Sequence, residues 1–325
     1  MVAATSIRPS PSPLLRAYLL GLAGVGIFSL SLPMTRLALR ELDPLFVTAA
    51  RLALAGLLGA AYLAGRRSHW PDGHGRRLLA WVIGGVVVAF PLFSALAMRT
   101  TDAAHGGVVL AVMPLMTAAA AVLLGGERPP ALFWACAASG SLVVASFVLY
   151  EAGGPPTPGD GLLVLAAIGA GFGYAGGAAL ARTMPGLEVI AWALALSLPV
   201  TLPGMLMLWP ENAASVSPSS WGVVLFLAVA VQFLGFYFFY GGLARGGAAR
   251  IGQVQLLQVY LTMAAGALLL GERIGPSTLI AALVTIFFVW LGRRAYAGHR
   301  STTADSASEN TASAPQNGMS SSRSS

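Results

Sequence analysis

Ten long apolar runs, separated by short polar stretches, are the main pattern along the chain. Each run is close to the length of about 20 residues that a helix needs to cross a bilayer core. The runs are continuously apolar and do not alternate, which favours helices over the strands of a membrane barrel. The pattern predicts an all-helical membrane protein with ten transmembrane helices. The runs lie at about residues 15–37, 45–65, 78–98, 105–124, 131–150, 161–183, 187–209, 220–243, 248–270 and 276–297.

Three segments outside the runs have a different composition. Residues 1–14 are polar and rich in Pro and Ser, and residues 298–325 are dominated by Ser, Thr, Ala and Asn, so we expect both to be disordered. Residues 151–160, EAGGPPTPGD, are expected to form a loop because Gly and Pro punctuate them. The first apolar run lacks a clear cleavage site, so we interpret it as a retained helix and not as a signal peptide.

Composition narrows the class of protein further. The chain has 325 residues, of which 56% are hydrophobic and only 10% charged, and its mean hydropathy is +0.75. A soluble domain carries about 25% charged residues, so these values argue against a cytosolic enzyme or a secreted scaffold. The single cysteine, Cys136, lies within an apolar run, which leaves no intramolecular disulfide and indicates simple packing. We expect no metal site and no cofactor.

The net charge of +7 comes from 19 basic residues, all of which are arginine. They are scattered singly and in pairs between the apolar runs, which fits an orientation signal better than a nucleic-acid-binding face. If the N-terminus lies inside, most of the arginines fall on the cytoplasmic side. The positive-inside rule therefore predicts that both termini are cytoplasmic.

Two segments far apart in the chain are similar to each other. Residues 117–128, TAAAAVLLGGER, and residues 262–273, TMAAGALLLGER, match at eight of twelve positions at an offset of 145. Each closes an apolar run, the fourth and the ninth. We therefore predict two five-helix halves, at residues 15–150 and 161–297. Because five is odd, the halves would cross the membrane in opposite orientations, which is a plan that many secondary transporters use.

These features resemble the EamA branch of the drug/metabolite transporter superfamily. The resemblance is carried by the two five-helix halves, the endings LLGGER and LLLGER, and the segment VVLAVMPLMTA at residues 108–118. The second half departs from the first, because Val259 stands where Pro114 does. The resemblance implies a carrier that exports amino acids or other small metabolites. Together with the arginine-only, Ala- and Gly-rich composition, it implies a bacterial inner membrane.

Polar side chains inside membrane spans are energetically costly and by default indicate a substrate path. The ninth run carries the most of them. Gln255, Gln258 and Thr262 are spaced i, i+3 and i+7 and share one helical face. Gln258 lies near the midpoint of the run, where transporter sites tend to lie. We expect this stripe to bind substrate; the alternative is that it forms hydrogen bonds to neighbouring helices.

Three further polar residues lie in the middle of apolar runs. Gln232 lies in the eighth run and is followed by several aromatic residues, an arrangement that could line a pocket for an organic solute. Tyr174 lies in the sixth run and Ser29 in the first. All three are candidate substrate-binding residues.

Arg51 is the only charged residue clearly inside a run, the second. It is a candidate for attracting a carboxylate on the substrate. Two structural alternatives remain open: an ion pair with Glu41 or Asp43, and extension of the side chain toward the outer surface.

Several residues near the ends of the runs have more limited roles in our interpretation. His105 follows Asp102 at the start of the fourth run and is a candidate for proton coupling, with an exposed helix start as the alternative. Glu127 and Glu272 end their runs at equivalent places, and we interpret both as structural.

Small residues and prolines inside the runs predict how the helices pack. Gly169, Gly173 and Gly177 form a stripe that allows close helix approach, either as static packing or as a sliding surface. Prolines at four positions are expected to kink their helices: Pro91, Pro114, Pro199 and Pro203.

Taken together, the sequence predicts a secondary transporter that works by alternating access and exports an amino acid or related polar solute. Its expected partners are this small molecule and the lipid bilayer; a homodimer is left open, and no nucleic acid is expected. No phosphate-binding G-x-x-x-x-G-K-[ST] motif is present, so the chain does not itself hydrolyse nucleotide. An uptake carrier or a channel of the same fold is an alternative. A membrane enzyme is less favoured, because no catalytic constellation is evident.

Overall fold

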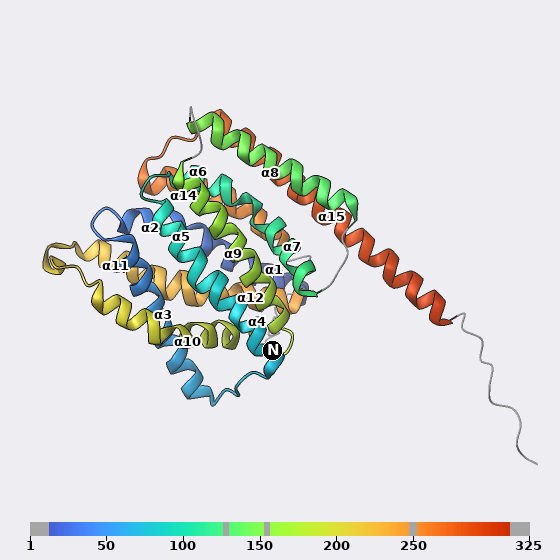
Figure 1. The fold of residues 1–325 in the computed structure, drawn as a ribbon, viewed down its shortest axis with the longest axis horizontal. Helices are drawn as coiled ribbons and strands as arrows, with labels where there is room; N and C mark the ends of the chain where they lie inside the picture. The colour runs from blue at the N-terminus through green and yellow to red at the C-terminus, as the bar shows by residue number, and fades with distance from the viewer. Residues whose placement is uncertain (1–12, 126–129, 153–156, 247–251, 313–325) are drawn as a thin grey trace, which may run out of the picture.

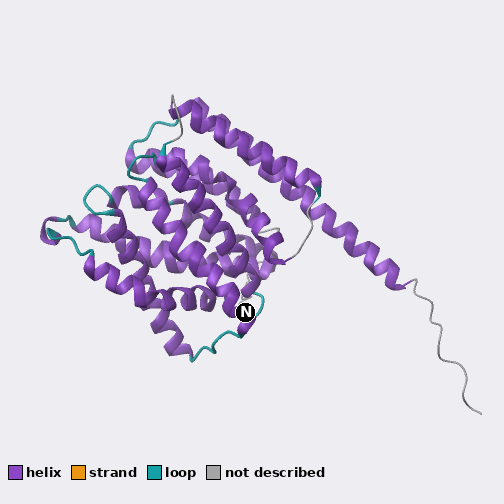
Figure 2. Cartoon of the chain, viewed as in Figure 1, coloured by secondary structure: helices purple, strands orange, loops and turns teal. Residues whose placement is uncertain are grey.

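The fold was obtained as a computed structural model, which describes residues 13–125, 130–152, 157–246 and 252–312. Within these ranges every regular element is helical, and no strand is present (Figure 2). The expected class of an all-helical protein is therefore confirmed.

The first half contains eight α-helices, one π-helical segment and one 3₁₀ turn within these ranges. They are α1 (Pro13–Ser29), α2 (Ser31–Ala38), α3 (Pro44–Arg66), α4 (Gly73–Val82), the π-helical η1 (Ile83–Ala89), α5 (Phe90–Ala97), α6 (Ala103–Val109), the 3₁₀ turn η2 (Leu110–Val112), α7 (Met113–Gly125) and α8 (Ala131–Ala152).

The second half has a similar succession of elements. They are α9 (Pro158–Leu180), α10 (Gly186–Met207), the 3₁₀ turn η3 (Ala213–Ser215), α11 (Pro218–Phe226), the π-helical η4 (Leu227–Leu234), α12 (Gly235–Gly246), the 3₁₀ turn η5 (Gly252–Gln255), α14 (Leu256–Leu270) and α15 (Pro276–Ala312).

Seven continuous helical segments of the described chain are long and apolar enough to cross a membrane. Three shorter apolar helices, Ala131–Phe147, Leu257–Leu270 and Pro276–Gly292, fall on the fifth, ninth and tenth expected runs. A multi-pass membrane protein is therefore supported, whereas the exact number of ten spans stays a prediction.

The C-terminal segment differs from the expectation. We predicted disorder from residue 298, but α15 continues as a helix to Ala312 (Figure 1). The next proline along the chain is Pro315, so no residue before it blocks propagation from the apolar part of the helix. Residues 1–12 and 313–325, where disorder was also expected, lie outside the described residues.

Several helices begin with the same local signal, a capping side chain followed by proline. Asp43, Thr157 and Ser217 cap α3, α9 and α11, and in each case their side chains accept a hydrogen bond from a backbone N–H of the first turn. The proline that follows fits because its missing N–H would be unpaired there anyway. These signals fix where three of the long helices start.

The two halves pack against each other through matching pairs of elements. Helix α1 of the first half lies against α12 and α14 of the second, and α9 of the second half lies against η1, α5 and α7 of the first. The first span therefore packs on the eighth and ninth spans, and the sixth span packs on the third and fourth. The last helix of each half, α8 and α15, form a pair at the edge of the bundle (Figure 1).

The glycine stripe of α9 allows this helix to approach its neighbours closely. Gly173 lies so near η1 that a Cβ there would come within 2.7 Å of the backbone nitrogen of Val86. Gly177 leaves room for the ring of Tyr240 from α12. The stripe therefore holds the sixth span against the third and the eighth; whether it also slides remains a prediction.

Two adjacent glycines in η1 allow a matched test of this packing. A Cβ on Gly85 would collide with the Gly169 carbonyl oxygen and come within 2.7 Å of the Gly173 nitrogen, whereas nothing lies within 4 Å of a Cβ on Gly84. We expect Gly85→Ala to destabilise the protein by about 1–3 kcal/mol and Gly84→Ala to have little effect. Thermal unfolding of both variants in detergent measures this difference, and equal unfolding temperatures would contradict the close packing.

Candidate functional site

Two adjoining cavities lie in the centre of the bundle. The first leaves a space of about 20 Å³ and the second about 10 Å³, which in this closed state is room for about one water molecule each. Four side chains line both: Phe28, Ser31, Phe90 and Gln258. The walls come from both halves, so the space lies between them. We refer to the two together as the central cavity.

The predicted glutamine stripe of the ninth span faces the first part of this cavity. Gln255, Gln258 and Thr262 all line it, and each is at least nine-tenths buried. Among the described residues, no hydrogen-bond partner reaches Nε2 of Gln255 or Oε1 of Gln258. The cavity therefore presents one free donor and one free acceptor, which can bind polar groups of a solute.

Arg51 and Gln232 meet in the second part of the cavity. Arg51 is 1% exposed and Gln232 is fully buried. Nη2 of Arg51 donates to Oε1 of Gln232 over 2.9 Å, while Nε2 of Gln232 donates to the backbone oxygen of Val86 over 3.1 Å. The second, third and eighth spans are thus joined by one hydrogen-bonded chain.

The structural alternatives for Arg51 are wrong in this fold. The expected carboxylate partners are engaged elsewhere: Asp43 accepts from the backbone of Leu45, and Glu41 accepts from the backbone and hydroxyl of Ser217. These bonds from Ser217 hold the pKa of Glu41 below its usual value. The side chain of Arg51 does not reach the surface either, because it is turned inward toward Gln232.

The guanidinium of Arg51 is left with most of its donors free. Within the described part of the chain, neither Nε nor Nη1 has a hydrogen-bond partner, and no carboxylate forms an ion pair with it. Burying an unpaired charge costs several kcal/mol even after the protein relaxes. A charge held at that cost points to a function rather than to stability.

A proline explains why Thr262 bonds to the first helix. In an α-helix the N–H of residue 33 would donate to the Ser29 carbonyl, but Pro33 has no N–H. The helix is interrupted between α1 and α2 at Leu30, and the hydroxyl of Thr262 donates to the Ser29 oxygen over 3.1 Å. The ninth span thereby satisfies a carbonyl that the first span cannot.

A second proline accounts for the bond between Gln232 and Val86. In the π-helical segment η1, bonds run from residue i+5 to residue i, so the partner of the Val86 carbonyl would be the N–H of residue 91. That residue is Pro91, which has none. The Gln232 amide takes its place. The kink expected at Pro91 stays a prediction.

Ser31 is a cavity residue that sequence reasoning missed. It lines both parts of the cavity, is 2% exposed, and its hydroxyl has no partner among the described residues. The expected residue, Ser29, lines neither part, because its hydroxyl donates to Gly26 within its own helix over 2.6 Å. Proximity to Pro33 was the available signal, since the residues just before a proline lie where a helix is interrupted.

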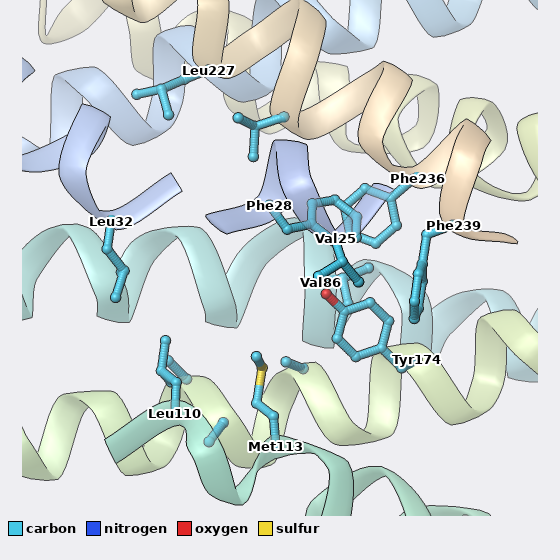
Figure 3. Packing of buried hydrophobic residues seen from close by; sticks show 14 of the residues in the cluster. Val25, Phe28, Leu32, Val86, Leu110, Met113, Tyr174, Leu227, Phe236 and Phe239 are labelled. Atoms are coloured by element: carbon cyan, nitrogen blue, oxygen red, sulfur yellow. The ribbon is translucent and has the colours of Figure 1, made fainter. Parts of the chain in front are cut away.

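Tyr174 belongs to an aromatic cluster at one end of the central cavity. Its ring lies 6.3 Å from that of Phe28, 6.0 Å from Phe236 and 5.4 Å from Phe239, measured between ring centroids (Figure 3). Tyr240 continues the cluster next to Phe236. Three of these rings, those of Phe28, Tyr174 and Phe236, also line the second part of the cavity.

One end of the bundle is hollowed. A depression of about 490 Å³ lies where α2 ends, and three arginines and two carboxylates contribute to its lining. We call this the Arg36 hollow. Its charged lining residues are Arg36, Arg40, Arg99, Asp43 and Glu272.

Glu272 connects three segments beside this hollow. Gly271, with φ of 70°, ends α14 in the left-handed conformation that favours glycine, and the chain turns back there. The carboxylate then accepts from the N–H groups of Ala103 and Ala104, each over 2.9 Å, and from Nη1 of Arg36 over 3.0 Å. Arg36 also pairs with Asp102. Gly271 and Glu272 of the LLLGER ending therefore place a carboxylate cap on the start of α6. Glu127, which corresponds to Glu272 in the first half, lies outside the described residues.

His105 lies apart from the central cavity. Its Nε2 is 2.8 Å from Oδ1 of Asp160, which forms the capping box of α9 with Thr157, and its ring packs on Phe147. His105 and Asp160 line a depression of about 220 Å³ that also includes Asp102 and Glu272. A role in proton coupling remains a prediction.

Comparison with known proteins fits this architecture. The family model of the EamA-like transporters matches twice, at residues 15–150 and 157–292. The uncharacterized transporter YdeK of Bacillus subtilis (strain 168) is 39% identical over 274 residues, which cover 84% of this chain and 96% of the relative. One solved crystal structure of a protein has 22% identity and a TM-score of 0.56, and the match covers 85% of this chain and 97% of its own. The likeness to this last protein shows the fold alone.

The bond from Thr262 to the freed carbonyl can be tested against its repeat counterpart. Thr117 donates to Met113 within its own helix, where the carbonyl is not freed by a proline. We expect Thr262→Val to lower the free energy of unfolding by about 1 kcal/mol or more, because it leaves the buried Ser29 oxygen unpaired. Thr117→Val is expected to be nearly neutral. Thermal unfolding of both measures this, with Thr262→Ser as the variant that should restore stability.

Proposed function

We propose that this chain, which belongs to the EamA-like transporter family, is a secondary active transporter for a small organic metabolite. Family membership makes it a membrane transporter and not an enzyme. The finer proposal is that it exports an amino acid or a related polar solute by alternating access. It would act in a bacterial inner membrane, with both termini in the cytoplasm.

The observation that carries the proposal is the central cavity with its free polar atoms. Ser31 Oγ, Gln255 Nε2 and Gln258 Oε1 are buried and lack partners within the described part of the chain. Leaving buried polar groups unpaired costs free energy, about 1–3 kcal/mol each. A transported solute with donors and acceptors of its own would satisfy them, and this gives the cavity its affinity for polar solutes.

Alternating access is supported by the asymmetry along the bundle. The Arg36 hollow opens one end, while on another side the packed rings of Phe28, Tyr174 and Phe236 wall the central cavity. The contacts between the halves come in matching pairs, as two oppositely inserted repeats would produce. Rocking of one half against the other would separate the aromatic rings and close the hollow.

Transport through this cavity predicts that Gln258 is needed for solute release. Cells that produce the intact protein are compared with cells that produce Gln258→Ala, at equal membrane levels, by untargeted mass spectrometry of the medium. We expect at least one polar metabolite to accumulate outside with the intact protein and its release to fall about tenfold in the variant, since one hydrogen bond to the solute is lost. Asn212→Ala, which removes an exposed loop amide, is the matched control.

The outcomes separate the alternatives. Equal release by the intact protein and Gln258→Ala would be compatible with a carrier but would show that Gln258 does not bind the solute. Depletion of a solute from the medium would indicate uptake instead of export. Flux in liposomes that does not saturate would favour a channel.

A further inference from the structure

We propose that Arg51 and Gln232 form an anion-binding subsite, and that the solute carries a single carboxylate which binds there. The inference rests on the proposed function and makes it more specific, because it names the charged group that the cavity recognises. It is argued from the free donors of Arg51, the position of Gln232 and the low polarity around the guanidinium.

The first argument is the number of free donors on one buried cation. A guanidinium has five N–H donors, and within the described residues Arg51 donates one hydrogen bond, to Gln232. Nε and Nη1 face no acceptor among the residues that the structure describes. A carboxylate is the group whose geometry matches these planar donors, and it would also neutralise the charge.

The second argument is that Gln232 holds Arg51 in place while using only one of its donors. Its carbonyl oxygen occupies one donor of Arg51, and its amide group is held by the Val86 oxygen that Pro91 leaves free. The amide of Gln232 is therefore fixed in orientation before any solute arrives. It keeps the guanidinium turned toward the cavity and leaves the remaining donors open for an oxyanion.

The third argument is the low polarity around the subsite. Phe28, Phe90, Tyr174 and Phe236 line this part of the cavity with Arg51. An ionic hydrogen bond is stronger in such surroundings than in water. One cation balances one negative charge, so the subsite fits a monocarboxylate better than a dicarboxylate or a phosphate dianion.

The subsite is tested on the purified full-length protein in detergent with pairs of probes that differ in one charge. Acetate, lactate and benzoate are each compared with their primary amides, acetamide, lactamide and benzamide, at constant ionic strength. We expect at least one carboxylate to raise the unfolding temperature where its amide does not. Arg51→Gln is expected to weaken the apparent affinity for that carboxylate about 10- to 100-fold, and Arg51→Lys to weaken it less.

Two controls keep a folding defect from being mistaken for a lost site. Arg66→Gln removes an exposed arginine at the end of the same helix and should leave the carboxylate response intact. Without any probe, Arg51→Gln should unfold at or above the temperature of the intact protein, because it removes an unpaired buried charge while an amide remains to donate to Gln232. A large loss of stability in Arg51→Gln would identify Arg51 as a structural residue and overturn the proposal.

The remaining outcomes distinguish this inference from the proposed function. If no carboxylate is preferred to its amide, or if Arg51→Gln keeps the preference, the subsite is overturned even where metabolite release shows a working carrier. If the preference depends on Arg51 but the intact protein moves no solute into or out of cells, the subsite stands and the transport proposal fails.

Discussion

The central cavity depends on backbone carbonyls that prolines leave without an N–H partner. In the interior of a membrane protein no bulk water can satisfy such a group, so a side chain must do so. Pro33 frees the Ser29 carbonyl and Pro91 frees that of Val86, and both are reached by side chains of the other half, Thr262 and Gln232. The halves are therefore joined at the cavity by bonds that a helix would normally make within itself.

The same bonds determine what the cavity leaves available. Gln232 uses its donor on the Val86 carbonyl, so only its oxygen can meet Arg51, and one oxygen cannot satisfy a guanidinium. Thr262 uses its hydroxyl on Ser29, whereas Gln255 and Gln258 on the same stripe keep free polar atoms. The polar residues of the cavity thus divide into those that hold the helices together and those that remain open to a solute.

The sequence alone was sufficient for features that depend on local pattern. The apolar runs, the Gly-Glu ending and the glutamine stripe are periodic or local, and each lies on a helix, at a helix end or on the cavity wall, as expected. Features set by contacts between distant residues were not accessible. Arg51 and Gln232 were each identified as polar residues inside apolar runs, but their contact across the two halves was not predicted, because hydropathy does not show which spans adjoin. Ser29 and Ser31 lie on either side of the interruption between α1 and α2, and only Ser31 lines the cavity. The sequence does not show which of the two serines faces the cavity.

The two halves are alike in architecture but not in the chemistry of the cavity. At the offset of the repeat, Gln255 and Gln258 correspond to Leu110 and Met113, and all four line the first part of the cavity. The two corresponding segments are thus polar in the ninth span and apolar in the fourth. Such a cavity suits a solute with a polar end and an apolar body. The polar end would form hydrogen bonds with the glutamines, and the apolar body would pack on Leu110 and Met113 without burying an unpaired polar group. The two halves therefore differ in polarity at the positions that would contact a solute.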